Sequence, residues 1–184
     1  MEASLSHVIG TVALILLTAS AASYFAAAVY HIQTEILKQH LTEVANYILT
    51  SIIEITVLIR FTDILNNATI FKTLNLQTDI SGYAYIVELK GESGEGAYLH
   101  LYISSRRDVE VSLKLPLKIA ETNVKIFTVN DEAIILSARN GVIKPSGRVY
   151  GGGKNIVAWG WRENTTLIWA GIGTWDGGGG SARI

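Results

Sequence analysis

The first third of the chain follows one long apolar helical pattern. Residues 8–30 contain no charge, and this stretch of 23 residues is long enough for a helix to cross the hydrocarbon core of a bilayer. Between Tyr30 and Ile59 there is no Pro or Gly, and apolar residues return in steps of three and four. The pattern predicts one continuous helix from residue 2 to about residue 58, which at 1.5 Å per residue is about 85 Å long.

The second half of this helix is predicted to be amphipathic. Polar residues separate the members of an apolar stripe, which are Leu37, Leu41, Val44, Ile48, Ile52, Ile55 and Ile59. Towards the end, further apolar residues widen the stripe: Leu49, Ile53, Val57 and Leu58. A helix that is apolar nearly all round is buried from more than one side. We therefore expect the rest of the chain to cover one side and a partner to cover the other.

After residue 80 the apolar residues recur at every second position, which is the period of half-buried strands. The alternation is clearest at 83–89 and 109–115, and the GESGEG sequence at 91–96 predicts a hairpin turn into a strand at 97–103. Further strands are predicted at 122–129, 132–138, 154–161 and 165–172. Short strands at this spacing are typical of a small antiparallel β-sandwich or barrel.

The predicted fold class is therefore α+β, with a long N-terminal hydrophobic helix followed by a small β-sandwich or barrel head. We expect three regions: the helix at 1–60, a transition segment at 61–80 with a turn at Asn66-Asn67, and the β-rich head at 81–184.

Composition and charge exclude several classes of ligand. The net charge is −1 and the only adjacent basic pair is Arg106-Arg107, so nucleic acid is not expected as the main ligand. There is no cysteine, which excludes disulfides and thiolate metal sites. The four His residues are widely separated along the chain, so we predict no metal and no cofactor.

The sequence also lacks the patterns of an enzyme. There is no Gly-x-Ser-x-Gly elbow and no cysteine nucleophile, and the acidic residues fall in predicted turns or on polar strand faces. The glycine runs at 151–153 and 177–180 lack the lysine and the helix N-terminus of a phosphate-binding loop. We therefore predict that the chain is not an enzyme, and that these glycines lie in a loop and in the tail.

All four tryptophans lie in the last 26 residues. Trp159, Trp161 and Trp169 fall in predicted strands, where aromatic residues are favoured, and are expected in the sheet core. An alternative is that some of these rings, together with Tyr150 and Trp175, contact neighbouring subunits or a ligand.

Two Asn-x-Thr sequences make Asn67 and Asn164 candidates for N-glycosylation. Both fall in predicted turns of a head that should face outward, where a glycan could be attached.

Three functions of the long helix are possible from its length and composition: a permanent membrane anchor, a membrane segment that is later buried in a filament, and an arm of a soluble coiled coil. Residues 8–30 have no charged face to keep a soluble bundle in water, which disfavours the last. Small residues allow helix backbones to approach closely, which favours a packed assembly over an isolated anchor. They are Ala13, Thr18, Ala19, Ser20, Ala21, Ala22, Ser23, Ala26, Ala27 and Ala28.

With the sequence LSHVIGTVALILLTASAASYFAAAVYHIQTEIL, its helical continuation to about Ile59 and the β-rich head, the chain resembles the archaeal type IV pilin and archaellin superfamily. The resemblance implies a short basic leader that a prepilin peptidase removes, unless Met1 is the mature start. It implies residence in the cytoplasmic membrane before assembly, and then a helical homopolymer built by an ATPase-driven pilus assembly machinery. Position 5 is Leu5, where bacterial pilins have Glu, and archaeal relatives commonly lack that Glu.

The resulting hypothesis is a structural subunit of an archaeal type IV pilus-like extracellular filament on the cell surface, serving adhesion, with pilus and archaellum not distinguished. The residues expected to pack in the filament core are Val8, Val12, Ile15, Leu16, Ala19, Ala22, Ala26, Leu37, Leu41, Val44, Ile48 and Ile52. The main alternative is a membrane-anchored accessory protein of the archaellum or cell envelope, which does not polymerise and whose β-sandwich binds another component. An anchored enzyme or solute-binding head is a second alternative.

Overall fold

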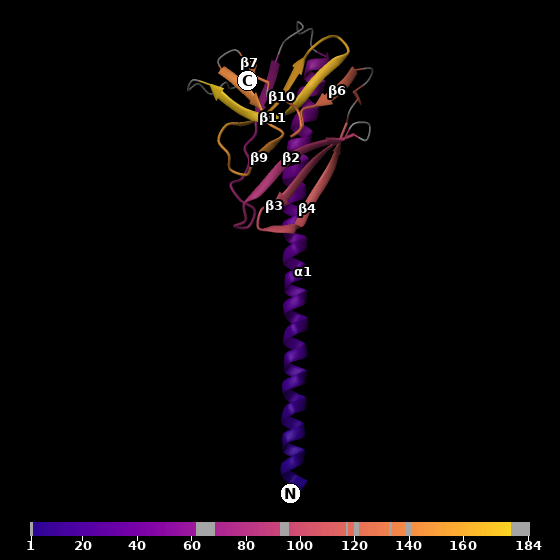
Figure 1. Cartoon of the computed structure of the whole chain (residues 1–184), viewed down its shortest axis with the longest axis vertical. Helices are drawn as coiled ribbons and strands as arrows, with labels where there is room; N and C mark the ends of the chain where they lie inside the picture. Colours follow the sequence, from indigo (N-terminus) through magenta and orange to yellow (C-terminus); the bar gives the residue numbers. More distant parts are fainter. Residues whose placement is uncertain are drawn as a thin grey trace. The chain divides into compact units, whose positions relative to one another are not determined.

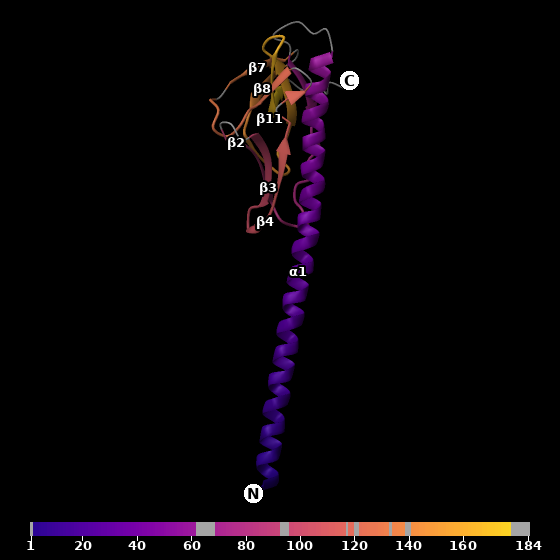
Figure 2. The ribbon, with the colours of Figure 1, turned by 90° about the vertical axis from the view of Figure 1, so that its right-hand side faces the viewer.

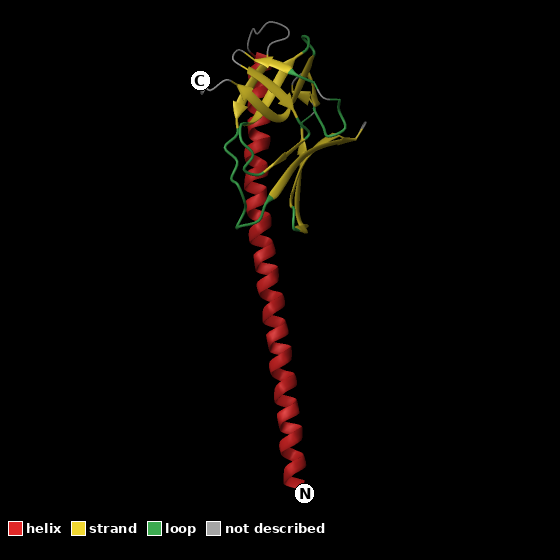
Figure 3. Ribbon diagram, turned by 60° about the vertical axis from the view of Figure 1, so that its left-hand side comes forward, coloured by secondary structure: helices red, strands yellow, loops and turns green. Residues whose placement is uncertain are grey.

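The structure is a computed structural model, which describes residues 2–61, 69–92, 96–116, 118–119, 122–132, 134–138 and 141–177. Within these residues one long helix, α1 (Glu2–Phe61), is followed by strands alone (Figure 1, Figure 3). The predicted α+β class, with a hydrophobic helix followed by a small β-rich head, is confirmed.

The helix α1 has sixty residues and confirms the prediction of one unbroken helix to about residue 58. Gly10 is tolerated within it and lies in open space, since a Cβ at this position would meet no atom within 4 Å. The chain divides into two compact units, Met1–Leu37 and Lys38–Ile184. Among the described residues, the first unit contains only helix, and the second contains the rest of α1 and every strand.

The strands form two sheets. Their bounds are β1 (Thr69–Thr73), β2 (Tyr85–Glu92), β3 (Gly96–Ile103), β4 (Arg106–Leu115), β5 (Lys118–Ile119), β6 (Thr122–Ile126), β7 (Leu136–Ala138), β8 (Gly141–Pro145), β9 (Arg148–Tyr150), β10 (Ile156–Arg162) and β11 (Leu167–Gly177). The seven-stranded sheet has the order β1-β10-β11-β6-β5, with β8 paired to the last part of β11 and β7 paired to β8. The four-stranded sheet has the order β4-β3-β2-β9.

Pairing is antiparallel in both sheets except between β6 and β11, the one parallel pair among the described strands. In that pair Val124 lies opposite Ile168, and Ile126 lies opposite Ala170. The residues between β6 and β11 return the chain to the same end of the sheet, which antiparallel hairpins do not do. The antiparallel prediction therefore describes most of the head but not this central contact.

Several strands differ from the predicted ones. The segment 61–80 contains β1, which pairs with β10 from Thr69 opposite Trp161 to Thr73 opposite Val157. The predicted strand at 132–138 is reduced to β7, while β8 and β9 were not predicted. The expected tail is part of β11 as far as Gly177, because β8 provides a partner for its last residues.

The four-stranded sheet has one buried face and one polar face. Tyr85, Val87, Leu89, Leu99 and Leu101 alternate along β2 and β3, and each is at most 1% exposed. Because successive side chains point to opposite faces of a sheet, the residues between them lie together on the other face. This second face is polar and contains the charged cluster described below.

The last part of α1 covers the core of the head. Its stripe of Leu41, Ile48, Ile52, Ile55 and Ile59 is buried, as the sequence pattern predicts. Figure 2 shows both sheets on the same side of this part of the helix. A Cβ at Gly160 of β10 would lie 2.5 Å from Ile59 Cδ1 and 2.8 Å from Ile55 Cγ2, so the helix and the strand approach as closely as glycine allows.

The tryptophans belong to a cluster of apolar side chains formed mainly by residues of the seven-stranded sheet. Trp159 is fully buried, its Nε1 donates to the Ile172 carbonyl over 2.8 Å, and its ring meets Phe127 edge-on at 5.9 Å. Trp161, Trp169 and Trp175 are partly buried and pack against the same cluster. The expectation of a tryptophan-rich sheet core is therefore confirmed for Trp159, and the others line its rim.

Candidate functional site

The N-terminal part of α1 presents large apolar side chains without cover. Leu14, Leu16 and Leu17 are 63%, 65% and 66% exposed, and Tyr24 is 73% exposed. The helix contains a stretch that is long and apolar enough to cross a membrane, and the described chain buries none of that stretch. This part of the molecule is therefore compatible with membrane insertion, and it needs cover from outside the chain.

The hydroxyl groups of this segment do not make it polar, because they bond to their own helix. Thr11 donates to the His7 carbonyl over 2.8 Å, and Ser23 donates to the Ala19 carbonyl over 2.9 Å. The hydroxyls of Thr18, Ser20 and Thr34 also donate to carbonyls three or four residues earlier. Polar groups satisfied in this way can enter an apolar environment at little cost.

The residues predicted to pack in a filament core fall into two groups. Val8, Val12, Ile15, Leu16, Ala19, Ala22 and Ala26 are exposed. Leu37, Leu41, Ile48 and Ile52 are at most 3% exposed, and Val44 is half-buried. The second group is already covered in a single copy of the chain, so the part of the predicted set that is free for a partner lies before Leu37.

The end of α1 is only partly covered, as its wide apolar surface predicts. Ile53 and Val57 are half-buried, while Leu58 is 54% and Phe61 is 73% exposed. The covering partner that the sequence predicts for this end stays a prediction.

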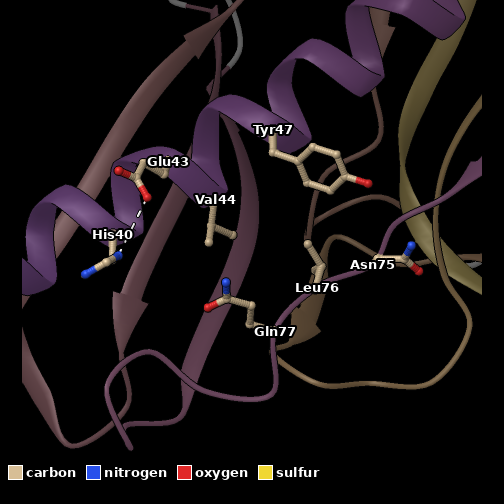
Figure 4. A pocket seen from close by; sticks show the side chains of 7 residues that line it. All are labelled: His40, Glu43, Val44, Tyr47, Asn75, Leu76 and Gln77. Atoms are coloured by element: carbon tan, nitrogen blue, oxygen red, sulfur yellow. Dashed lines mark ion pairs between the residues drawn. The ribbon is translucent and has the colours of Figure 1, made fainter.

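A shallow groove of about 350 Å³ lies between α1 and the segment that follows β1. Its walls are His40, Glu43, Val44 and Tyr47 from the helix, and Asn75, Leu76 and Gln77 from the segment (Figure 4). The His40 imidazole lies 3.6 Å from the Glu43 carboxylate on the rim. The groove has both apolar and amide surface.

A second concave site lies on the polar face of the four-stranded sheet, with a volume of about 340 Å³. It is centred on Glu88 of β2, whose side chain is only 4% exposed. The Glu88 carboxylate accepts a hydrogen bond from Tyr102 Oη over 3.0 Å and forms ion pairs with Arg148 at 2.5 Å and Lys90 at 3.3 Å. A buried carboxylate needs such partners, and this one has three.

These contacts shift the titration of the cluster. Burial by itself raises the pKa of Glu88, but the hydrogen bonds from Tyr102 and Lys90 and the positive charges of Arg148 and Lys90 outweigh it, so this pKa lies below its usual value. Burial and the charge of Lys90 lower the pKa of His100, which favours the neutral form of its imidazole. Burial and the Glu88 carboxylate raise the pKa of Tyr102.

The remaining predicted residues lie at separate places. Tyr150 ends β9 on the polar face of the four-stranded sheet and is 60% exposed, as a contact residue requires. Trp175 packs on Phe71 with ring centroids 5.4 Å apart, so its ring makes contacts within the chain itself. Among the described residues no three His, Asp or Glu side chains lie together as metal ligands.

The glycosylation candidates also differ in what the structure shows. Asn164 is exposed in the turn between β10 and β11, where its Oδ1 accepts hydrogen bonds of 2.9 Å from both the amide and the hydroxyl of Thr166. Asn67 and the Asn66-Asn67 turn lie outside the described residues.

The glycine runs are divided in the same way. Residues 151–153 form the turn from β9 to β10, in which Gly152 has a positive φ of 71° and a Cβ at Gly151 would enter the Tyr85 ring. Gly177 ends β11, and 178–180 lie outside the described residues.

Sequence reasoning did not find the Glu88 site. The only signal was a set of polar residues at alternate positions on strands whose other face is apolar. Any solvent-exposed face of a sheet gives the same pattern. No protein-family model, no curated protein and no solved structure matches this chain significantly.

Proposed function

We propose that this chain is the structural subunit of an extracellular filament of the archaeal type IV pilus kind, and that it polymerises through α1 to serve surface adhesion. The observation that supports this most is the uncovered apolar helix. Thirteen large apolar side chains between Val8 and Ile36 are at least 47% exposed. Lipid can cover such a helix before assembly, and copies of the same helix can cover it afterwards.

The energy of covering this helix sets a requirement on the assembly. Burying a large apolar side chain fully stabilises by about 1.5–3 kcal/mol, so covering half of the area of all thirteen contributes on the order of 10 kcal/mol per subunit. Association itself costs about 4–15 kcal/mol. One neighbour covers only one side of a helix, so a stable polymer needs several helices around each copy.

Side-chain size supports packing between helices. Ala19, Ala22 and Ala26 are spaced by three and four residues, so they lie on one face of α1, and all three are exposed. Lipid fills the space beside small and large side chains equally well, whereas two helices approach closely only where the side chains are small. The exposed alanine face is therefore better suited to a helix than to lipid alone.

The proposal places the head outside the filament, with glycans at Asn164 and Asn67. Intact-mass measurement before and after deglycosylation, with Asn164→Gln as the comparison, tests the first of these. A mass that deglycosylation leaves unchanged would remove the glycoprotein part and leave the filament part standing.

Electron microscopy of the full-length chain tests the central claim. We expect helical fibres in which mass spectrometry finds this chain as the main component. A chain recovered only as monomers in detergent micelles, under conditions where the cells that make it bear no fibres, contradicts polymerisation and favours the membrane-anchored accessory protein.

A further inference from the structure

The polar face of the four-stranded sheet has an order that the strand register makes visible. Glu88 on β2 lies between Arg148 on β9 and His100 on β3, and His100 lies opposite Ser112 on β4. In the next row Tyr102 lies opposite Glu110. Four neighbouring strands thus bring charged, aromatic and hydroxyl side chains to one concave surface that faces solvent, on the far side of the sheet from the core.

The charge of this surface is positive after its internal pairs are counted. Lys90, Arg107 and Arg148 line the site against two carboxylates, Glu88 and Glu110, and the lowered pKa of His100 favours its neutral form. Glu88 is buried and forms its ion pairs inside the site, so groups of the protein itself compensate its negative charge. The Lys90 and Arg148 side chains remain 54% and 47% exposed. The Glu110 side chain is also exposed, at 59%, so the accessible wall presents three cations beside one carboxylate.

Aromatic rings lie beside these cations. Tyr102 lines the site and its ring centroid is 5.4 Å from that of His100. Tyr150 follows Arg148 by two residues on the same face of the sheet and is 60% exposed. Tyr98, which precedes His100 by two residues on the same face, is half-buried. Amphipathic rings of this kind provide flat apolar surface at a wet site.

We propose that this surface is a binding site for a carboxylate-bearing sugar, such as a uronic acid residue of a surface polysaccharide. The sugar carboxylate pairs with the cations of the wall, the hydroxyls meet Tyr102, His100 and Ser112, and a ring face lies against an exposed tyrosine. A volume of about 340 Å³ is at the small end of ligand pockets, which suits one or two sugar rings.

Other anions fit this surface less well. A phosphate group alone would use the cations but would leave the tyrosine surface without a role. A peptide carboxylate would need an apolar pocket for its side chains, whereas no aliphatic side chain of the described residues lines this site. The combination of cations, hydroxyls and rings is what favours an acidic sugar.

The role of this site in adhesion rests on the proposed filament, but binding itself does not. The test is therefore a calorimetric titration of the full-length chain in detergent, with trigalacturonate as the probe and neutral maltotriose as the comparison. We expect trigalacturonate to bind more tightly than maltotriose and to bind more weakly as salt rises, because the contact is charged. A chain that binds neither sugar, or both equally, overturns the proposal.

Two variants locate the binding, and a third controls for charge. Arg107→Gln removes an accessible cation without touching the Glu88 ion pairs, and we expect it to weaken trigalacturonate binding by about tenfold, which corresponds to one charge-assisted hydrogen bond of about 1.4 kcal/mol. Tyr150→Ala should weaken it several-fold. Lys154→Gln removes an equal charge from the exposed turn between β9 and β10 and should have no effect.

The outcomes separate the two proposals. Binding that Lys154→Gln weakens as much as Arg107→Gln is general attraction to positive charge and contradicts the site. Site-specific binding by a chain that forms no fibres supports the site and refutes the filament. Fibres that fail to bind trigalacturonate refute the site and leave the filament in place.

Discussion

Replacing two alanines on one face of α1 by leucine distinguishes a helix that packs in a polymer from one that remains in lipid. Ala22 and Ala26 are four residues apart and exposed. The neighbouring residues Ala19 and Ser23 are also small, so no large side chain projects from this face. The variant Ala22→Leu/Ala26→Leu fills that face with two bulky side chains. It also makes the segment slightly more apolar, so membrane insertion should be maintained or improved.

The expected loss follows from the cost of overpacking, about 1–3 kcal/mol for each substitution that forces a packed contact apart. Two such substitutions cost about 2–6 kcal/mol per subunit. At about 1.4 kcal/mol for each factor of ten, even the lower figure raises the subunit concentration needed for assembly by about 30-fold. Fibres should then disappear at ordinary expression levels.

The matched control is Ala21→Leu, which makes the same chemical change on a different face, about 100° around the helix from Ala22 and about 140° from Ala26. There Leu17, Tyr24 and Phe25 already stand out from the helix and hold any neighbour away, so a further leucine should be tolerated. The assay counts fibres by electron microscopy and measures the membrane-bound pool by fractionation. Normal fibres from the double variant, with its alanine face filled, would refute close helix packing as the basis of assembly.

Three further predictions concern the head, each measured by thermal unfolding of the full chain in detergent. Gly160→Val should lower the free energy of unfolding by about 1–3 kcal/mol, because the new side chain enters the space of Ile59. The control Gly10→Ala, at a position in open space, should not destabilise the protein. Equal melting temperatures for the wild type and Gly160→Val would contradict the close approach of helix and strand. The lowered pKa of Glu88 contributes stability that is present above its unfolded pKa and is lost as the pH falls through its folded value. Glu88→Gln should therefore flatten the acid limb of the stability curve, and an unchanged limb would contradict this. Trp159→Phe should cost about 1–3 kcal/mol through its buried hydrogen bond and lost volume, and a neutral effect would show that the bond contributes nothing.

The helix was predictable because its signals are local. Sixty residues in which only Gly10 strongly lowers helix propensity, with an apolar stripe that starts at Leu37, specify α1 without knowledge of any other element. The stripe also predicted which side chains the head buries. What the sequence left open is the cover of the residues before Leu37, because that cover comes from outside the chain.

The sheets were predictable only in part because pairing depends on distant residues. The strand β1 has five residues in a stretch without a sustained alternation of apolar and polar residues, and it pairs with β10 along its whole length. In the same way β8 extends β11 beyond Gly173, which converts an expected tail into sheet and places Trp175 against Phe71. A period of two residues shows that a strand can form but not which strand it joins.

The charged site shows the same limit more sharply. Glu88 and His100 lie on the consecutive strands β2 and β3, whereas Arg148 comes from the distant strand β9. Only the register of these three strands aligns the side chains in one row. A shift of one residue in any of these strands would turn its side chain to the buried face. The sequence shows each of these polar residues, but it does not show that they lie close together in the fold.

The position of β11 has a consequence for how the molecule is made. This strand comes last among those described, yet it is central to the larger sheet, with β10, β6 and β8 all bonded to it. A ribosome has already synthesised α1 and ten strands before β11 emerges, so the nascent chain cannot close that sheet during most of its translation. Premature termination anywhere before Leu167 should leave a chain that still forms the helix but whose larger sheet lacks its central strand.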